Sequence, residues 1–184
     1  MGSPFQLRLG ADTLRKGGVL AWPTEAIYGI GCDPLNPHAV QRLLALKQRP
    51  LSKGFILVAA NLDQLLPFIE PPPEAQMQTV LNSWPGPHTW LLPASPQTPV
   101  RITGGTGMVA VRVTAHPIAR NLCLAFGGAL TSTSANRSGH PPARTALEVR
   151  LRCPGTDTIL HGSTGGLLNP TPIRNPLSDE VIRP

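Results

Sequence analysis

The sequence predicts an α/β fold in which helices cover the faces of one sheet. Short apolar runs typical of strands alternate along the chain with amphipathic stretches typical of helices, and this alternation is the pattern of an α/β sheet. The chain has 184 residues, of which 41% are hydrophobic and 14% charged, so it can bury a substantial core. We therefore expect one globular domain over residues 1–184.

Each expected element has a local signal. The strand-like runs lie at residues 19–22, 55–60, 89–92, 108–113, 128–132 and 158–160. The helix-like stretches lie near residues 36–48, 61–68, 74–83, 116–126 and 145–152. Asn36 followed by Pro37 is a favoured helix start, and Thr145 with Glu148 has the spacing of a capping box.

Charge and cysteine usage limit the class of protein. The formal net charge is +6 and the pI about 10.0, which suits an anionic partner such as nucleic acid or a phosphorylated substrate, although a basic surface can also simply favour solubility. Three cysteines lie far apart and form neither a disulfide framework nor a zinc motif. No run resembles a signal peptide or a membrane span, so we expect a cytoplasmic protein without membrane association.

The common catalytic motifs are absent from the sequence. It has no G-x-x-x-x-G-K-[ST] phosphate loop, no G-x-S-x-G elbow and no histidine spacing typical of a metal site. Any chemistry must therefore depend on positioning and electrostatics.

The stretch LKQRPLSK at 46–53 concentrates positive charge. Lys47 falls four residues after Leu43 on the apolar stripe of the preceding helix, where a lysine is not chosen for packing. Arg49 precedes Pro50, which disfavours helical backbone at Arg49. Lys47 and Arg49 can therefore point into one space and bind an anion. Alternatively, they stabilise the helix dipole while the lysine stem reaches water.

A second polar stretch, LTSTSANRSG at 130–139, follows a strand-like run. It offers several hydroxyl groups and the amide of Asn136, an inventory that suits a polar ligand such as a nucleotide. An ordinary Ser/Asn-rich turn is the alternative interpretation.

Together these stretches resemble the YrdC-like family, most closely its single-domain TsaC-type threonylcarbamoyl-AMP synthases. Five motifs occur in the family's order: PTEAIYGIGCD (23–33), LKQRP (46–50), WPGPHT (84–89), VAVRV (109–113) and STSAN (132–136). The resemblance covers residues ~17 to 184 and implies an open, twisted mixed sheet with flanking helices and a basic concave cleft.

The resemblance implies roles for individual residues at the nucleotide. Lys47 and Arg49 match the family's catalytic K-x-R, which meets the phosphates of ATP. Ser134 and Asn136 match its S-x-N nucleotide contacts, and Arg183 resembles a terminal nucleotide-binding arginine.

Other matching positions bind L-threonine in the family. They are Thr24, Thr171 and Arg112, and Arg112 faces the carboxylate of the amino acid. Asn175 stands where the family has an acid, so the resemblance does not carry over to this chain any role of that acid, including metal support.

The resemblance also implies a reaction. The family makes threonylcarbamoyl-AMP from L-threonine, bicarbonate or CO2 and ATP, with Mg²⁺, and releases diphosphate. Partner proteins then transfer the threonylcarbamoyl group to an adenosine beside the tRNA anticodon. We expect no metal site made of protein ligands, because Mg²⁺ can be held mainly by phosphate oxygens and water.

Two alternatives remain open at this stage. The chain could be a non-catalytic module that binds double-stranded RNA or tRNA. Its few aromatic residues argue against base stacking, so such binding would depend on the RNA backbone. It could also handle carbamoyl phosphate, as do hydrogenase maturation proteins with a YrdC-like module, but those chains are much longer.

Overall fold

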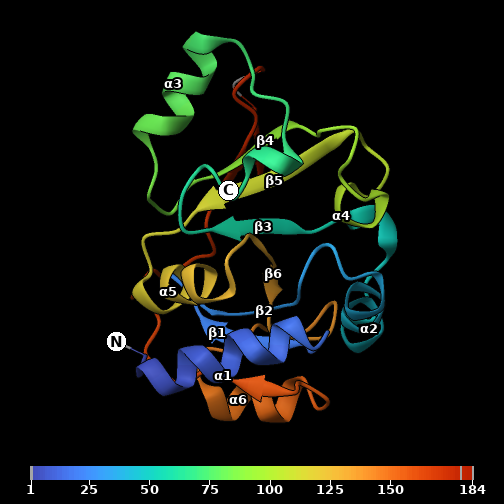
Figure 1. Cartoon of the computed structure of the whole chain (residues 1–184), viewed down its shortest axis with the longest axis vertical. Helices are drawn as coiled ribbons and strands as arrows, with labels where there is room; N and C mark the ends of the chain where they lie inside the picture. The colour runs from blue at the N-terminus through green and yellow to red at the C-terminus, as the bar shows by residue number, and fades with distance from the viewer. Residues whose placement is uncertain (1, 179, 184) are drawn as a thin grey trace.

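The computed structural model describes residues 2–178 and 180–183, without the side chain of Arg183. In that part of the chain one mixed sheet has the strand order β7-β1-β2-β6-β3-β5-β4-β8-β9, with helices on both sides (Figure 1). The strands are β1 (Leu20–Pro23), β2 (Tyr28–Gly31), β3 (Ile56–Ala59), β4 (Thr89–Pro93), β5 (Met108–Val113), β6 (Leu130–Ser134), β7 (Thr158–Ile159), β8 (Ile173–Arg174) and β9 (Val181–Arg183). The α-helices are α1 (Pro4–Arg15), α2 (Pro37–Lys47), α3 (Glu74–Asn82), α4 (Val100–Thr103), α5 (Pro117–Phe126) and α6 (Ala146–Arg152). The 3₁₀ turns are η1 (Leu51–Lys53) and η2 (Leu66–Phe68).

The expected α/β class is confirmed, and most expected elements are present. Four of the five expected helices correspond to α2, α3, α5 and α6, and the six expected strands correspond to β1 and β3 to β7. The expected helix at 61–68 is wrong, because this stretch forms little more than η2. Pro67 lacks the N–H that a helix would need there, and its ring disfavours helical backbone at Leu66.

The predicted helix starts are confirmed in atomic detail. The side chain of Asn36 accepts hydrogen bonds from the backbone N–H groups of His38 and Ala39 at 3.1 and 3.0 Å, directly before α2. Thr145 and Glu148 form the reciprocal capping box of α6. Both caps satisfy backbone donors that the first turn of a helix leaves without partners.

The sheet is buried on both faces by two apolar clusters. Along β1, Ala21 belongs to a large cluster that includes residues of α2, α3 and α6. Leu20 and Trp22 belong to a second cluster with residues of α1 and α5. Successive side chains of a strand point to opposite faces, so this division places α1 and α5 together on one face. The two helices lie side by side in Figure 1.

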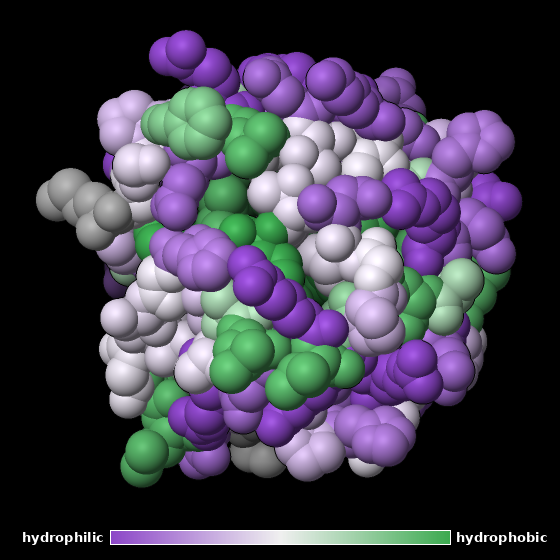
Figure 2. Space-filling view, turned by 90° about the horizontal axis from the view of Figure 1, so that it is seen from below, coloured by the Kyte–Doolittle hydropathy of each residue, from purple (hydrophilic) through white to green (hydrophobic). Residues whose placement is uncertain are grey.

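The end of the molecule where α1 and α6 lie has a mixed surface. Seen from that end, hydrophilic residues predominate, with apolar residues between them (Figure 2). The exposed apolar side chains include Leu147 and Leu151 of α6. Among the residues that the structure describes, no helix is long and apolar enough to cross a membrane.

Candidate active site

A pocket of about 500 Å³ opens where α1 and α5 stop covering their face of the sheet. Strand register builds its floor: Ile56 of β3 pairs with Ser132 of β6 on one side and Ala110 of β5 on the other, and Ala110 pairs with Leu91 of β4. All four side chains line the pocket. This row of paired residues is therefore polar at Ser132 and apolar from Ile56 to Leu91.

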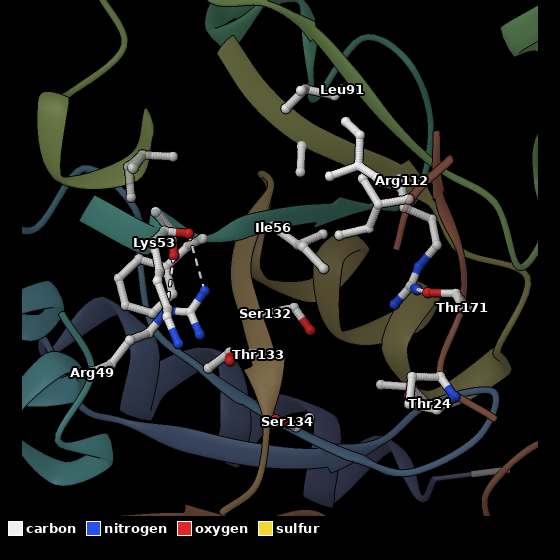
Figure 3. A pocket seen from close by; sticks show the side chains of 18 of the residues that line it. Thr24, Arg49, Lys53, Ile56, Leu91, Arg112, Ser132, Thr133, Ser134 and Thr171 are labelled. Carbon is white, nitrogen blue, oxygen red and sulfur yellow. Dashed lines mark hydrogen bonds between the residues drawn. The ribbon is translucent and has the colours of Figure 1, made fainter. Parts of the chain in front are cut away.

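The stretch from the end of α2 to η1 brings two cations to one end of the pocket. The helix ends at Lys47, and Gln48 takes a left-handed conformation with φ 50°, so the chain turns before Pro50. Arg49 and Lys53 both line the pocket (Figure 3).

The guanidinium of Arg49 is fixed by backbone and by an aromatic ring. It donates to the carbonyl oxygens of Gly54 and Lys53 at 3.0 and 3.1 Å, and it lies 5.5 Å from the centre of the Phe55 ring. These contacts hold a flexible side chain in one orientation, which lowers the entropic cost of binding an anion.

Lys47 lies beneath the pocket rather than among its lining residues. Its side chain is 2% exposed, as its place on the buried stripe predicts. Its ammonium donates to the carbonyl oxygens of Ser134 and Asn136, the latter at 2.8 Å, and lies 3.4 Å from Asn136 Oδ1. Burial lowers the pKa of Lys47 to about 8, with a smaller contribution from the charge of Arg49. Lys47 and the 134–136 stretch, which lie far apart in the sequence, are therefore in direct contact.

The hydroxyl-rich end of β6 divides between pocket and interior. Ser132, Thr133 and Ser134 line the pocket between its two ends (Figure 3). Asn136 is buried, and its amide nitrogen donates to the carbonyl oxygens of Arg137 and His140. In this structure Asn136 shapes the turn that follows β6.

Arg112 of β5 forms the other end of the pocket, together with Thr24 and Thr171 (Figure 3). Arg112 is 4% exposed, and its guanidinium donates to the hydroxyl groups of Thr171 and, at 3.5 Å, Thr89. Thr24 donates its hydroxyl to the carbonyl oxygen of Ile27 at 2.8 Å. The structure thus brings together the three residues that the resemblance assigns to threonine.

A buried carboxylate lies behind Arg112. Glu25 Oε2 is 3.5 Å from Arg112 Nη2, and Glu25 Oε1 accepts a hydrogen bond from Thr114. Burial would raise the pKa of Glu25, but the charge of Arg112 and the Thr114 hydrogen bond outweigh it and hold the pKa below its ordinary value. Glu25 is therefore ionised at neutral pH.

His116 completes this buried group without adding charge. Its Nε2 lies 3.1 Å from the carbonyl oxygen of Ser163, an acceptor that places the proton on Nε2. Burial lowers the pKa of His116. The imidazole is neutral at pH 7, so the formal charges of Glu25, Arg112 and His116 sum to zero.

Sequence reasoning missed Lys53 and Glu25, although both had a signal. Lys53 belongs to the cationic stretch 46–53, and Glu25 is the single acid inside the apolar segment AWPTEAIYGIG. The side chain of Arg183 is outside the described residues, while Asn175 is not among the pocket-lining residues and accepts from the backbone N–H of Leu177 at 2.9 Å.

Cations at both ends, with neutral hydroxyl groups between them, are typical of a site for ligands with separate anionic groups. The fold and the site thus define an anion-binding α/β domain. The model of the Sua5/YciO/YrdC family, described as "Telomere recombination", matches residues 12–184, and the chain belongs to this family.

Two groups of relatives extend this finding. A protein of Halorhodospira halophila named threonylcarbamoyl-AMP synthase is 54% identical over 182 residues, 98% of this chain and 95% of that protein. P. abyssi Sua5, in a crystal structure complexed with L-threonine, superimposes with a TM-score of 0.88 at 33% identity over 94% of this chain. The present chain spans about half of that Sua5 chain, 51%. E. coli YciO has a TM-score of 0.82 at 28% identity, covering 96% of this chain and 87% of its own.

Proposed function

We propose that this chain is a threonylcarbamoyl-AMP synthase, which joins L-threonine, bicarbonate or CO2 and ATP and releases diphosphate. The observation that carries the proposal is that one pocket has Arg49 and Lys53 at one end and Arg112 at the other. Such a pocket can hold a triphosphate and an amino acid carboxylate at the same time. Curated relatives about half identical over almost their whole length carry this name.

The end of the pocket at Arg49 and Lys53, here called the elbow end, receives the triphosphate. Arg49 is already oriented by backbone carbonyl groups, and Lys53 adds a second cation from the same turn. Lys47 supplies positive charge from beneath, through the turn at Ser134 and Asn136. The hydroxyl groups of Ser132, Thr133 and Ser134 are donors for the nucleotide along the middle of the pocket.

The Arg112 end receives threonine. A guanidinium binds a carboxylate through two parallel hydrogen bonds, a geometry that lysine cannot supply. Thr24 and Thr171 add hydroxyl groups beside Arg112 for the polar atoms of the amino acid. P. abyssi Sua5, the relative of known structure named above, has been crystallised with L-threonine.

The chemistry needs alignment more than a strong base. The amine of threonine adds to CO2 to give a carbamate, and a carbamate oxygen then attacks the α-phosphorus of ATP as diphosphate leaves. This step brings two anions together, so fixed cations and aligned reactants lower its barrier by several kcal/mol. Arg49, Lys53 and Lys47 would stabilise the charge that grows on the diphosphate.

Magnesium belongs to this proposal as the companion of ATP. Among the described residues, no group of three His, Cys, Asp or Glu side chains could hold a metal ion. In this proposal Mg²⁺ would arrive with the nucleotide and be bound mainly by phosphate oxygens and water. A cytoplasmic location, transfer partners and contact with tRNA or double-stranded RNA remain predictions of the sequence.

One assay tests the function directly. The purified protein is incubated with labelled L-threonine, bicarbonate and Mg-ATP, and the products are separated to look for labelled acyl-adenylate and for diphosphate. We expect both products, and neither when threonine or bicarbonate is omitted. A protein that binds RNA but forms neither product would be the non-catalytic module instead.

A further inference from the structure

Arg112 at one end of the pocket and the lysines at the other end have different charged neighbours. At the Arg112 end, the carboxylate of Glu25 lies 3.5 Å behind the guanidinium, both side chains are less than a tenth exposed, and His116 is neutral. At the elbow end, the ammonium of Lys47 is bound by carbonyl and amide oxygens. In the part of the chain that the structure describes, no carboxylate is within ion-pair distance of Lys53.

This difference matters because the substrates share one pocket. A triphosphate carries several negative charges and would bind any uncompensated buried arginine strongly. Threonine carries one carboxylate and one amino group, so it makes a smaller demand for positive charge. A carboxylate fixed behind Arg112 repels a polyphosphate much more than it repels an amino acid. Such repulsion between like charges weakens binding of the nucleotide's phosphates at this end of the pocket.

We propose that Glu25 is a specificity-determining residue that keeps the nucleotide's phosphates out of the threonine end of the pocket. It acts through Arg112, by compensating the charge of the guanidinium, and it does not line the pocket itself. The inference rests on the proposed function, because it assumes that threonine binds at Arg112.

The local structure is built to keep this carboxylate in place. Glu25 follows the pocket residue Thr24 in the turn between β1 and β2, and the backbone N–H groups of Gly165 and Leu167 donate to the carbonyl oxygens of Thr24 and Glu25 at 2.9 and 3.0 Å. Thr114 holds Oε1 from the end of β5. The turn therefore places a ligand-binding hydroxyl and a buried charge in neighbouring positions.

The test measures competition between threonine and metal-free pyrophosphate by isothermal titration calorimetry. In the unmodified protein we expect pyrophosphate to bind at the elbow end and leave the affinity for threonine within about twofold. In Glu25→Gln, which keeps the shape but removes the charge, pyrophosphate should displace threonine and weaken its apparent affinity about tenfold or more.

Thr114→Val is the matched control. It removes the hydrogen bond to Glu25 but keeps the charge, so threonine and pyrophosphate should still bind together. Competition in Thr114→Val as strong as in Glu25→Gln would overturn the proposal, since general loosening would then explain both. A Glu25→Gln protein that binds both ligands without competition would also overturn it.

The unmodified protein supplies a measurement that does not depend on the fold of Glu25→Gln. A crystal soaked with pyrophosphate alone should show it beside Arg49 and Lys53, and pyrophosphate on Arg112 would overturn the proposal. Failure of the proposed function looks different, because the unmodified protein would then bind no threonine at all.

Discussion

The two ends of the pocket hold their cations in different ways. Arg112 projects from the middle of a sheet and is fixed by side chains, namely the buried carboxylate of Glu25 and the hydroxyl groups of two threonines. Arg49 and Lys53 project from the turn after a helix, and Arg49 is fixed by backbone carbonyl groups. The sheet end presents one fixed arginine, which suits a single carboxylate. The turn end presents Arg49, fixed by backbone, beside Lys53, which suits a ligand with several negative charges.

Arg112→Met should have the largest effect on stability. It leaves the buried carboxylate of Glu25 without its ion pair, and removing one partner of a buried pair costs about 3–5 kcal/mol. We expect the free energy of unfolding in urea to fall by about that amount and threonine-dependent diphosphate release to be lost. The double variant Glu25→Gln/Arg112→Met should recover part of the stability, and a double variant no more stable than the single one would contradict this account.

A matched surface pair provides the control for that experiment. Arg15 pairs with Asp12 at 3.1 Å, and both side chains are about half exposed. Asp12→Asn should change the free energy of unfolding by less than about 1 kcal/mol, because it removes this ion pair and leaves the hydrogen bonds from Arg15 to the carbonyl oxygens of Ala125 and Phe126 in place. A loss as large as that of Arg112→Met would show that burial is not what distinguishes the two pairs.

Arg49→Ala should affect activity more than stability. The residue is half-buried at the pocket, and loss of one fixed donor to a developing negative charge typically costs about 10²–10³ in turnover. Diphosphate release should fall accordingly, while urea unfolding stays close to that of the unmodified protein. Arg101→Ala, an exposed arginine in α4, is the control and should leave turnover unchanged. Unmodified turnover in Arg49→Ala would remove Arg49 from the mechanism.

Lys47→Met removes the buried charge beneath the pocket and should change how the free energy of unfolding depends on pH. The pKa of Lys47 is about 8 in the folded protein because of burial, below its ordinary value, so the unfolded chain binds more protons between about pH 8 and pH 10. This residue therefore makes the free energy of unfolding rise with pH across that window. Buried thiols titrate there with the opposite sign, so the difference between unmodified protein and variant is the quantity to measure.

We expect that difference in the free energy of unfolding to grow by about 2 kcal/mol from pH 8 to pH 10 in favour of the unmodified protein. Parallel curves for the two proteins would show that Lys47 keeps its ordinary pKa and is not confined as described. Lys47→Met should also lower the free energy of unfolding at all pH values, because it leaves carbonyl groups of the 134–136 turn without their donor.

The sequence carried enough information to predict the fold class and which stretches supply most of the pocket. It did not show which side chains contact one another there. The 3.6-residue period placed Lys47 on the buried side of α2, and its exposure of 2% confirms this. Its acceptors, Ser134 at the end of β6 and Asn136 in the turn that follows, lie almost ninety residues later in the sequence. Local periodicity cannot reveal contacts over that distance.

The missed strand β2 has a similar cause. Gly29 and Gly31 weaken its strand signal, yet a Cβ atom at Gly31 would lie 1.7 Å from the carbonyl oxygen of Thr131. The glycine is needed because two backbones approach closely, and that requirement exists only in the folded sheet. The very short strands β8 and β9 likewise depend on their neighbours rather than on their own sequence.

The smallest expected effect is a difference in reaction rate between two buried cysteines, one near each end of the pocket. Cys123 lies in α5 near Arg112, and burial raises its pKa to about 12. Cys153 follows α6 near Lys47, and burial raises its pKa as well, although the charge of Lys47 opposes the shift. Both thiols should react slowly with a disulfide reagent, because the thiolate is the reactive form. Mass spectrometry of partly labelled protein should find Cys153 modified before Cys123. Opening the end of the short helix α6 exposes less buried apolar surface than separating α5 from the sheet, so it should occur more often. Earlier labelling of Cys123 would show that the sheet end, not the turn end, is the more mobile part of the pocket.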